Sequence, residues 1–132
     1  MKLPTRYALA EIGALAVLSL VHWGRKMQFD APEIISYLLG VMPNVVAAIA
    51  IPFVSLSVWA EQRPTTSYSA LRGRFAIVSI IAGLGLIAWE ILQQSSHALV
   101  FDLHDIGASL MGLGIGILLF VLLTPKENEP FA

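Results

Sequence analysis

Cysteine is absent from this 132-residue chain, and charged side chains are scarce. Without a thiol the chain can form no disulfide, no thiolate metal site and no cysteine nucleophile. Charged residues make up 13% of the chain, whereas soluble domains typically carry about 25%. The net charge of −1 supplies no basic stripe that could meet phosphates, which argues against nucleic acid as a partner.

Hydrophobic residues, in contrast, make up 57% of the chain. They gather in four blocks at about 7–23, 36–60, 75–94 and 102–124, close to the roughly 17–25 residues of a transmembrane helix. The chain is too short to hold a separate soluble module as well. We therefore predict an all-α fold, an integral membrane four-helix bundle that forms a single domain over residues 1–132.

The first block follows a short basic start, as in a signal peptide. Glu11 interrupts the apolar run and no small-residue cleavage site follows it, so we expect a retained first transmembrane helix. The second block contains Pro43 and Pro52, and each proline removes a backbone donor and frees a carbonyl one turn earlier. We therefore expect the second helix to be interrupted by proline, either by two kinks or, as we favour, by a crossing that begins near Pro43.

The basic residues are distributed unevenly between the two sides of such a bundle. Six bases fall at the chain ends and in the second loop, and two fall in the first loop: Lys2, Arg6, Arg63, Arg72, Arg74 and Lys126 against Arg25 and Lys26. Loops rich in lysine and arginine stay in the cytoplasm. We predict a multi-pass protein of the plasma (inner) membrane with both termini cytoplasmic.

Polar side chains are concentrated where the third block ends and the fourth begins, at the predicted outer face. Glu90 and Gln93 lie on one side of the third helix, and Asp102, Asp105 and Ser109 follow the three- and four-residue spacing of one helical face. An acid inside a membrane segment is expensive and marks a functional site by default. The alternatives are that Arg25 or Lys26 neutralises Glu90, and that Asp102 and Asp105 only cap their helix.

Three further features are interpreted from their spacing. Glu11 lies in Ala10-Glu11-Ile12-Gly13, which resembles the essential glutamate of small multidrug-resistance exporters, although a pairing with Arg72 or Arg74 would also explain it. His97 and His104 have no metal-ligand spacing, so we predict no metal and no cofactor. The glycines of the fourth helix form a small-residue surface that we expect to pack against the third helix at Gly83 and Gly85.

Taken in order, the polar residues resemble a known family. Asn44 stands eight positions before Pro52-Phe53, Glu90-x-x-Gln93 closes the third block, and Asp102-x-x-Asp105-x-x-x-Ser109-x-x-Gly112-x-x-x-Gly116 opens the fourth. This order is similar to that of the VanZ-like family, small four-helix membrane proteins named after a teicoplanin-resistance factor. The chain departs from the family where Ser109 replaces the usual asparagine and Phe53 the usual glycine.

The resemblance implies a role in cell-envelope physiology and antibiotic tolerance. We hypothesise that the protein binds an envelope lipid, an envelope precursor or another amphipathic ligand, with membrane lipids and other membrane proteins as partners. The predicted ligand-binding residues are Asn44, Glu90, Gln93, Asp102, Asp105 and Ser109. Two alternatives are a membrane enzyme that uses Glu90 and Asp105 as an acid–base pair on a lipid-linked substrate, and a proton-coupled exporter that uses Glu11.

Overall fold

The computed structural model describes residues 1–27, 30, 32–94 and 103–125. These residues form four α-helices and no strand: α1 (Leu3–Lys26), α2 (Glu33–Gln62), α3 (Tyr68–Gln94) and α4 (Leu103–Leu123). All four are long and apolar enough to cross a membrane. The predicted all-α fold with four candidate membrane-spanning helices is confirmed.

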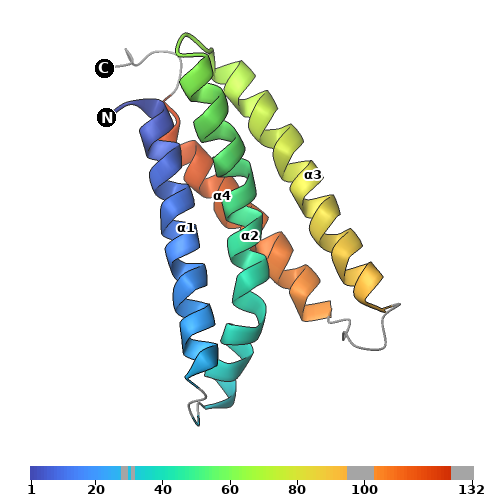
Figure 1. The fold of residues 1–132 in the computed structure, drawn as a ribbon. Helices are drawn as coiled ribbons and strands as arrows, with labels where there is room; N and C mark the ends of the chain where they lie inside the picture. Colours follow the sequence, from blue (N-terminus) through green and yellow to red (C-terminus); the bar gives the residue numbers. More distant parts are fainter. Residues whose placement is uncertain (28–29, 31, 95–102, 126–132) are drawn as a thin grey trace.

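The helices alternate in direction, so that α1 begins and α4 ends at the same end of the molecule (Figure 1). We call this the terminal end, and the other the distal end. α1 lies along α2, α4 crosses behind α2, and α3 lies on the opposite side of α2 from α1 (Figure 1). At the distal end the α1–α2 pair diverges from α3 and α4, and the rings of Tyr37 and His104 meet edge to face between α2 and α4, 5.5 Å apart.

Five aromatic rings from all four helices form the core near the terminal end. The Phe75 and Phe120 rings are stacked with centroids 4.5 Å apart. Tyr7 of α1 lies 6.5 Å from Phe120, and Phe53 of α2 lies 5.7 Å from Phe75, measured between centroids. Tyr68 of α3 packs on the outer side of Phe120, at 6.2 Å. Because each helix contributes at least one ring, this aromatic cluster ties the four helices together at this end.

Hydrogen bonds between α1 and the end of α4 also hold the helices together at the terminal end. The hydroxyls of Tyr7 and Thr124 are hydrogen-bonded at 2.8 Å and are both buried. At the positions directly before them, the Arg6 guanidinium donates to the Leu123 carbonyl at 3.3 Å. The last carbonyls of a helix have no partner within it, so Arg6 supplies a donor that α4 itself lacks.

α2 runs as one helix through both prolines, so the expected interruption is not seen. Pro43 has no amide hydrogen for the Leu39 carbonyl, and the Arg25 side chain supplies one: its Nε donates to Leu39 and an Nη donates to Gly40, both at 2.8 Å. A backbone carbonyl freed inside a membrane needs such a partner within the protein. Arg25 is therefore hydrogen-bonded to α2. It does not neutralise Glu90 of α3, because α1 does not pack against α3 within the described residues.

The glycine face of α4 packs on α2, and the expectation that it packs on Gly83 and Gly85 of α3 was wrong. A Cβ atom on Gly112 would lie 2.8 Å from the Ala48 Cβ and 2.9 Å from the Val45 Cα, so only glycine permits this approach. Gly85 and Gly114 face open space, and Gly83 meets the Leu113 side chain instead of a glycine. Close packing through small residues is a common way for membrane helices to associate.

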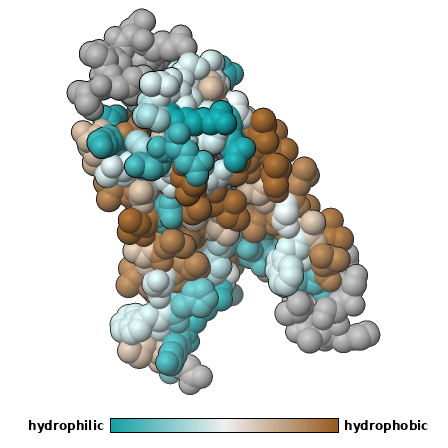
Figure 2. Space-filling view, turned by 45° about the horizontal axis from the view of Figure 1, so that its top comes forward, coloured by the Kyte–Doolittle hydropathy of each residue, from teal (hydrophilic) through white to brown (hydrophobic). Residues whose placement is uncertain are grey.

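The outer surface is apolar over most of the length of the helices. Thirty large hydrophobic side chains are exposed among the described residues, and Figure 2 shows hydrophobic residues along the sides and hydrophilic ones at both ends of the molecule. Trp23 and Trp89 are exposed toward the distal end, and Trp59 lies under the Arg63 guanidinium at the terminal end. Tryptophan near both ends of apolar helices is typical of the two membrane–water interfaces, which supports a multi-pass membrane protein.

The contact between Gly112 and α2 predicts an asymmetry between two alanine substitutions in α4. Gly112→Ala should lower the free energy of unfolding by roughly 1–3 kcal/mol, because the added methyl group overlaps the backbone of α2. Gly114→Ala is the matched control, since nothing lies within 4 Å of its added methyl group. Thermal unfolding of both variants in detergent, followed by circular dichroism, measures the difference; equal stability would show that the two helices do not meet at Gly112.

The hydrogen bonds of Arg25 predict coupling to Pro43. Arg25→Gln should destabilise the protein by about 1 kcal/mol, because the Leu39 carbonyl loses its donor. In a Pro43→Ala background the helix regains its own amide donor, so the same substitution should cost much less. Unfolding of the four proteins of this double-mutant cycle tests the coupling, with Lys26→Gln as the control for loss of a neighbouring charge. An Arg25→Gln effect of the same size in both backgrounds would contradict it.

Candidate functional site

The predicted ligand-binding residues that the structure describes all lie in the distal half of the bundle. Asn44 is on α2, Glu90 and Gln93 are near the end of α3, and Asp105 and Ser109 are near the start of α4. Asp102 and His97 lie outside the described residues. Three helices therefore bring polar side chains toward the same half of an otherwise apolar bundle.

Glu90 is the most buried ionisable side chain of this set, with 2% of its surface exposed. Its Oε1 accepts a hydrogen bond from the Gln93 amide at 3.0 Å. The two residues are three apart and therefore neighbours on one helical face. A carboxylate in such surroundings loses its hydration and is tolerated only when hydrogen-bond donors replace the water. Gln93 is one such donor.

Asp105 and Ser109 form a second pair, one turn apart on α4. Asp105 lies half-buried in the first turn, where its negative charge complements the helix dipole. Ser109 is 1% exposed, and its hydroxyl donates to the Asp105 backbone carbonyl at 2.9 Å. This bond and that between Gln93 and Glu90 each run within one helix, so neither joins α3 to α4.

Asn44 lies beside a close approach of α2 and α4. It is half-buried and precedes Val45, whose backbone contacts Gly112 of α4. α2 begins at Glu33, so Asn44 lies about 16 Å along the helix. Ser109 lies only one turn before Gly112. Asn44 and Ser109 are therefore at similar levels along the bundle.

Metal ligation receives no support from the described residues, in which no three His, Asp or Glu side chains gather around one point. His104, the described histidine of this region, packs its ring against Tyr37.

Glu11 is bound to a neighbour other than the expected ones. The Ser57 hydroxyl of α2 donates to its Oε2 at 3.0 Å and also approaches the Val54 carbonyl at 2.9 Å. Arg72 and Arg74 are on α3, which does not pack against α1 in the described part of the chain. The predicted pairing of Glu11 with either arginine was therefore wrong, and Glu11 instead links α1 to α2.

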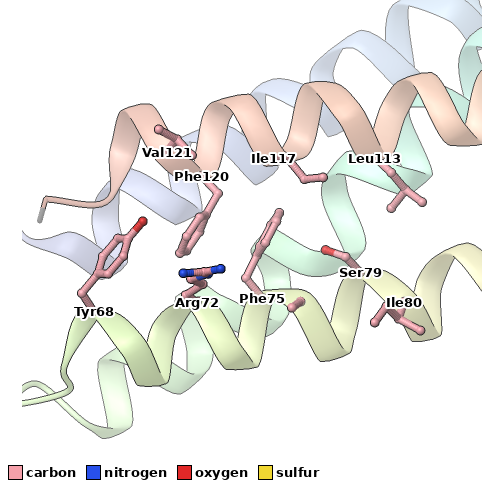
Figure 3. A pocket seen from close by; sticks show the side chains of 10 residues that line it. Tyr68, Arg72, Phe75, Ser79, Ile80, Leu113, Ile117, Phe120 and Val121 are labelled. Carbon is pink, nitrogen blue, oxygen red and sulfur yellow. The ribbon is translucent and has the colours of Figure 1, made fainter.

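A groove between α3 and α4 is a feature that the sequence analysis missed. It has a volume of about 370 Å³ and lies near the terminal end, with Phe75 and Phe120 in its wall (Figure 3). Arg72 and Ser79 point from α3 toward α4 (Figure 3). The Ser79 hydroxyl is buried and has no hydrogen-bond partner among the described residues. No sequence signal reveals the groove, because it depends on where two apolar helices diverge.

Comparison with known proteins adds no relative: no family model, no curated protein and no solved structure matches the chain.

The hydrogen bond of Ser109 predicts that its hydroxyl contributes little to stability. The Asp105 carbonyl lies in the helix backbone, so Ser109→Ala removes a bond that duplicates a helical one. We expect a change below about 0.5 kcal/mol in the free energy of unfolding. Tyr7→Phe is the comparison, because its bond to Thr124 joins two helices, and it should cost about 1 kcal/mol. If Ser109→Ala proves the more destabilising of the two in thermal unfolding, the hydroxyl of Ser109 has a partner on another helix.

Proposed function

We propose that this chain is a VanZ-like integral membrane protein that binds an envelope lipid or another amphipathic ligand in its distal half. The ligand-binding residues are Asn44, Glu90, Gln93, Asp102, Asp105 and Ser109. The observation that carries the proposal is the burial of Glu90, a carboxyl group 2% exposed near the end of an apolar helix. Such a group destabilises a fold by several kcal/mol unless its surroundings compensate for it, so its presence favours a function.

The side chains of this half indicate the chemistry of the ligand. Ionised carboxylates only accept hydrogen bonds, whereas asparagine and glutamine amides both donate and accept. A head group with hydroxyl, amide or amine donors can hydrogen-bond to Glu90 and Asp105. The side-chain amide of Asn44, on a third helix, can form a further hydrogen bond with it. The apolar surface around these residues suits the hydrocarbon part of the same ligand. These properties describe a polar head group on a lipid or an amphipathic envelope precursor.

The ordered resemblance to VanZ-like proteins supports a role in the cell envelope. With both termini cytoplasmic, as the distribution of basic residues predicts, the distal half faces the outer side of the inner membrane. Lipid-linked envelope precursors and glycopeptide antibiotics are encountered on that side. Teicoplanin is itself amphipathic, so protection against it is the phenotype that we propose for this chain.

The proposal predicts that two conservative substitutions abolish protection against teicoplanin. Expression of the wild-type chain in a teicoplanin-susceptible bacterium should raise the minimal inhibitory concentration severalfold. Glu90→Gln and Asp105→Asn keep the size and one accepting oxygen of the side chain but remove the negative charge, so each should return the inhibitory concentration to the level of the empty host. Glu61→Gln, an exposed acid at the terminal end, is the matched control and should retain protection.

Abundance of every variant in the membrane is measured alongside by immunoblot of a tagged chain. Protection retained by both Glu90→Gln and Asp105→Asn at wild-type abundance would contradict the proposal, as would a wild-type chain that gives none. In the first case the acids are structural: Asp105 serves the helix dipole and Glu90 serves the packing of α3.

A further inference from the structure

The groove between α3 and α4 is open to the surroundings of the bundle. Its ten lining residues come from these two helices alone, from Tyr68 to Ile80 on α3 and from Leu113 to Val121 on α4. With no third helix to close it, the groove faces whatever surrounds the bundle, which for membrane-spanning helices is lipid. A volume of about 370 Å³ lies within the ~300–1,000 Å³ range of small-molecule sites.

The groove is apolar along its length and polar at one end. Phe75, Phe120 and Ile117 are among the side chains that line it, whereas Arg72 and Tyr68 lie where it meets a second hollow of about 370 Å³. This second hollow is bordered by Tyr68, Ser69, Arg72, Gly73 and Ala76, and three of these residues also line the groove. The more polar hollow therefore meets the apolar groove at Arg72. A phospholipid has the same order of polar head group and apolar acyl chain.

The dimensions fit one leaflet. From Tyr68 to Ile80 the helix rises about 18 Å, and half of a hydrocarbon core of about 30 Å is about 15 Å. Arg72 lies one turn from the start of α3, where a long basic side chain reaches the head-group level. In Figure 3 its guanidinium lies between Tyr68 and Phe75, directed toward α4. No described residue forms a hydrogen bond or an ion pair with it.

The charge of the terminal end favours a negatively charged head group. Among the described residues, the bases at this end are Lys2, Arg6, Arg63, Arg72 and Arg74, and the acid next to them at the helix ends is Glu61. Basic residues next to a membrane attract anionic lipids to that side of it. Guanidinium groups also hold phosphate oxygens with two parallel hydrogen bonds, which adds geometric selectivity to the charge.

We propose that the groove between α3 and α4 is a binding site for an anionic phospholipid of the leaflet at the terminal end. Arg72 and the Tyr68 hydroxyl bind the phosphate, and one acyl chain lies against Phe75, Phe120 and Ile117. The site lies at the opposite end of the bundle from Glu90 and Asp105. It goes beyond the ligand of the distal half and does not depend on it.

Native mass spectrometry of the full chain in detergent, titrated with phosphatidylglycerol or phosphatidylcholine, tests this site. The wild-type protein should bind phosphatidylglycerol about tenfold more tightly, because only its head group carries a net negative charge. Arg72→Gln should reduce the affinity for phosphatidylglycerol about tenfold, the effect of losing one charge-assisted contact. Ala76→Phe should reduce it as much, since the ring fills the groove without changing the charge.

Each variant has a matched control on the same helix. Arg74→Gln removes the same charge two residues away and does not line the groove. Ile77→Phe adds a ring at the next position, an outward-facing side chain that is 57% exposed. Both controls should bind phosphatidylglycerol like the wild type. Loss of teicoplanin protection in Glu90→Gln and loss of phosphatidylglycerol binding in Arg72→Gln are separate results, because the two residues lie at opposite ends of the bundle.

Three outcomes would overturn the proposal. The first is that Arg74→Gln weakens binding as much as Arg72→Gln, which would indicate an effect of surface charge alone. The second is that Ala76→Phe leaves the affinity unchanged. The third is that the same spectra show dimers that Ala76→Phe dissociates, which would indicate that a second copy of the chain occupies the groove. Unfolding in detergent is measured for each variant. If Arg72→Gln fails to fold, the comparison of Ala76→Phe with Ile77→Phe decides.

Discussion

The aromatic cluster at the terminal end is the contact on which the bundle depends. In a membrane, burying an apolar side chain between helices gains little over leaving it in lipid, so close packing and polar contacts decide association. Stacked rings supply many atom contacts at well-defined distances, and Phe75 with Phe120 at 4.5 Å is the tightest pair. The hydrogen bond between Tyr7 and Thr124 closes the same end, and the helices are free to diverge away from it.

A second constraint fixes how they diverge. Gly112 lets α4 reach the backbone of α2, so this glycine of α4 faces α2 rather than α3. Along the groove, α3 and α4 do not fill the space between them. In the distal half, polar residues of three helices lie near one another in level along the bundle. The groove therefore lies where the packing of α4 on α2 leaves space beside α3.

Several polar groups of the bundle have individual partners. Arg25 supplies the donor that Pro43 removes, Ser57 binds Glu11, and Gln93 binds Glu90. The number of residues in each apolar block and the scarcity of charge predicted the four helices, because a span of about 20 apolar residues has few other solutions. The pairs within one helix, such as Glu90 with Gln93, followed from spacing. The partners of Arg25 and Glu11 did not, since they lie on another helix.

The sequence by itself determined that this is an all-helical chain with four segments able to cross a membrane, and which polar residues each segment carries. Only the tertiary structure decided that the glycine face meets α2, that α2 continues through its prolines, and that a groove lies between α3 and α4. The physical reason is the nature of the apolar surface: these helices are hydrophobic on almost every side, and the side that meets lipid resembles the side that meets another helix. Hydropathy therefore predicts the helices, and shape and hydrogen bonding decide their partners.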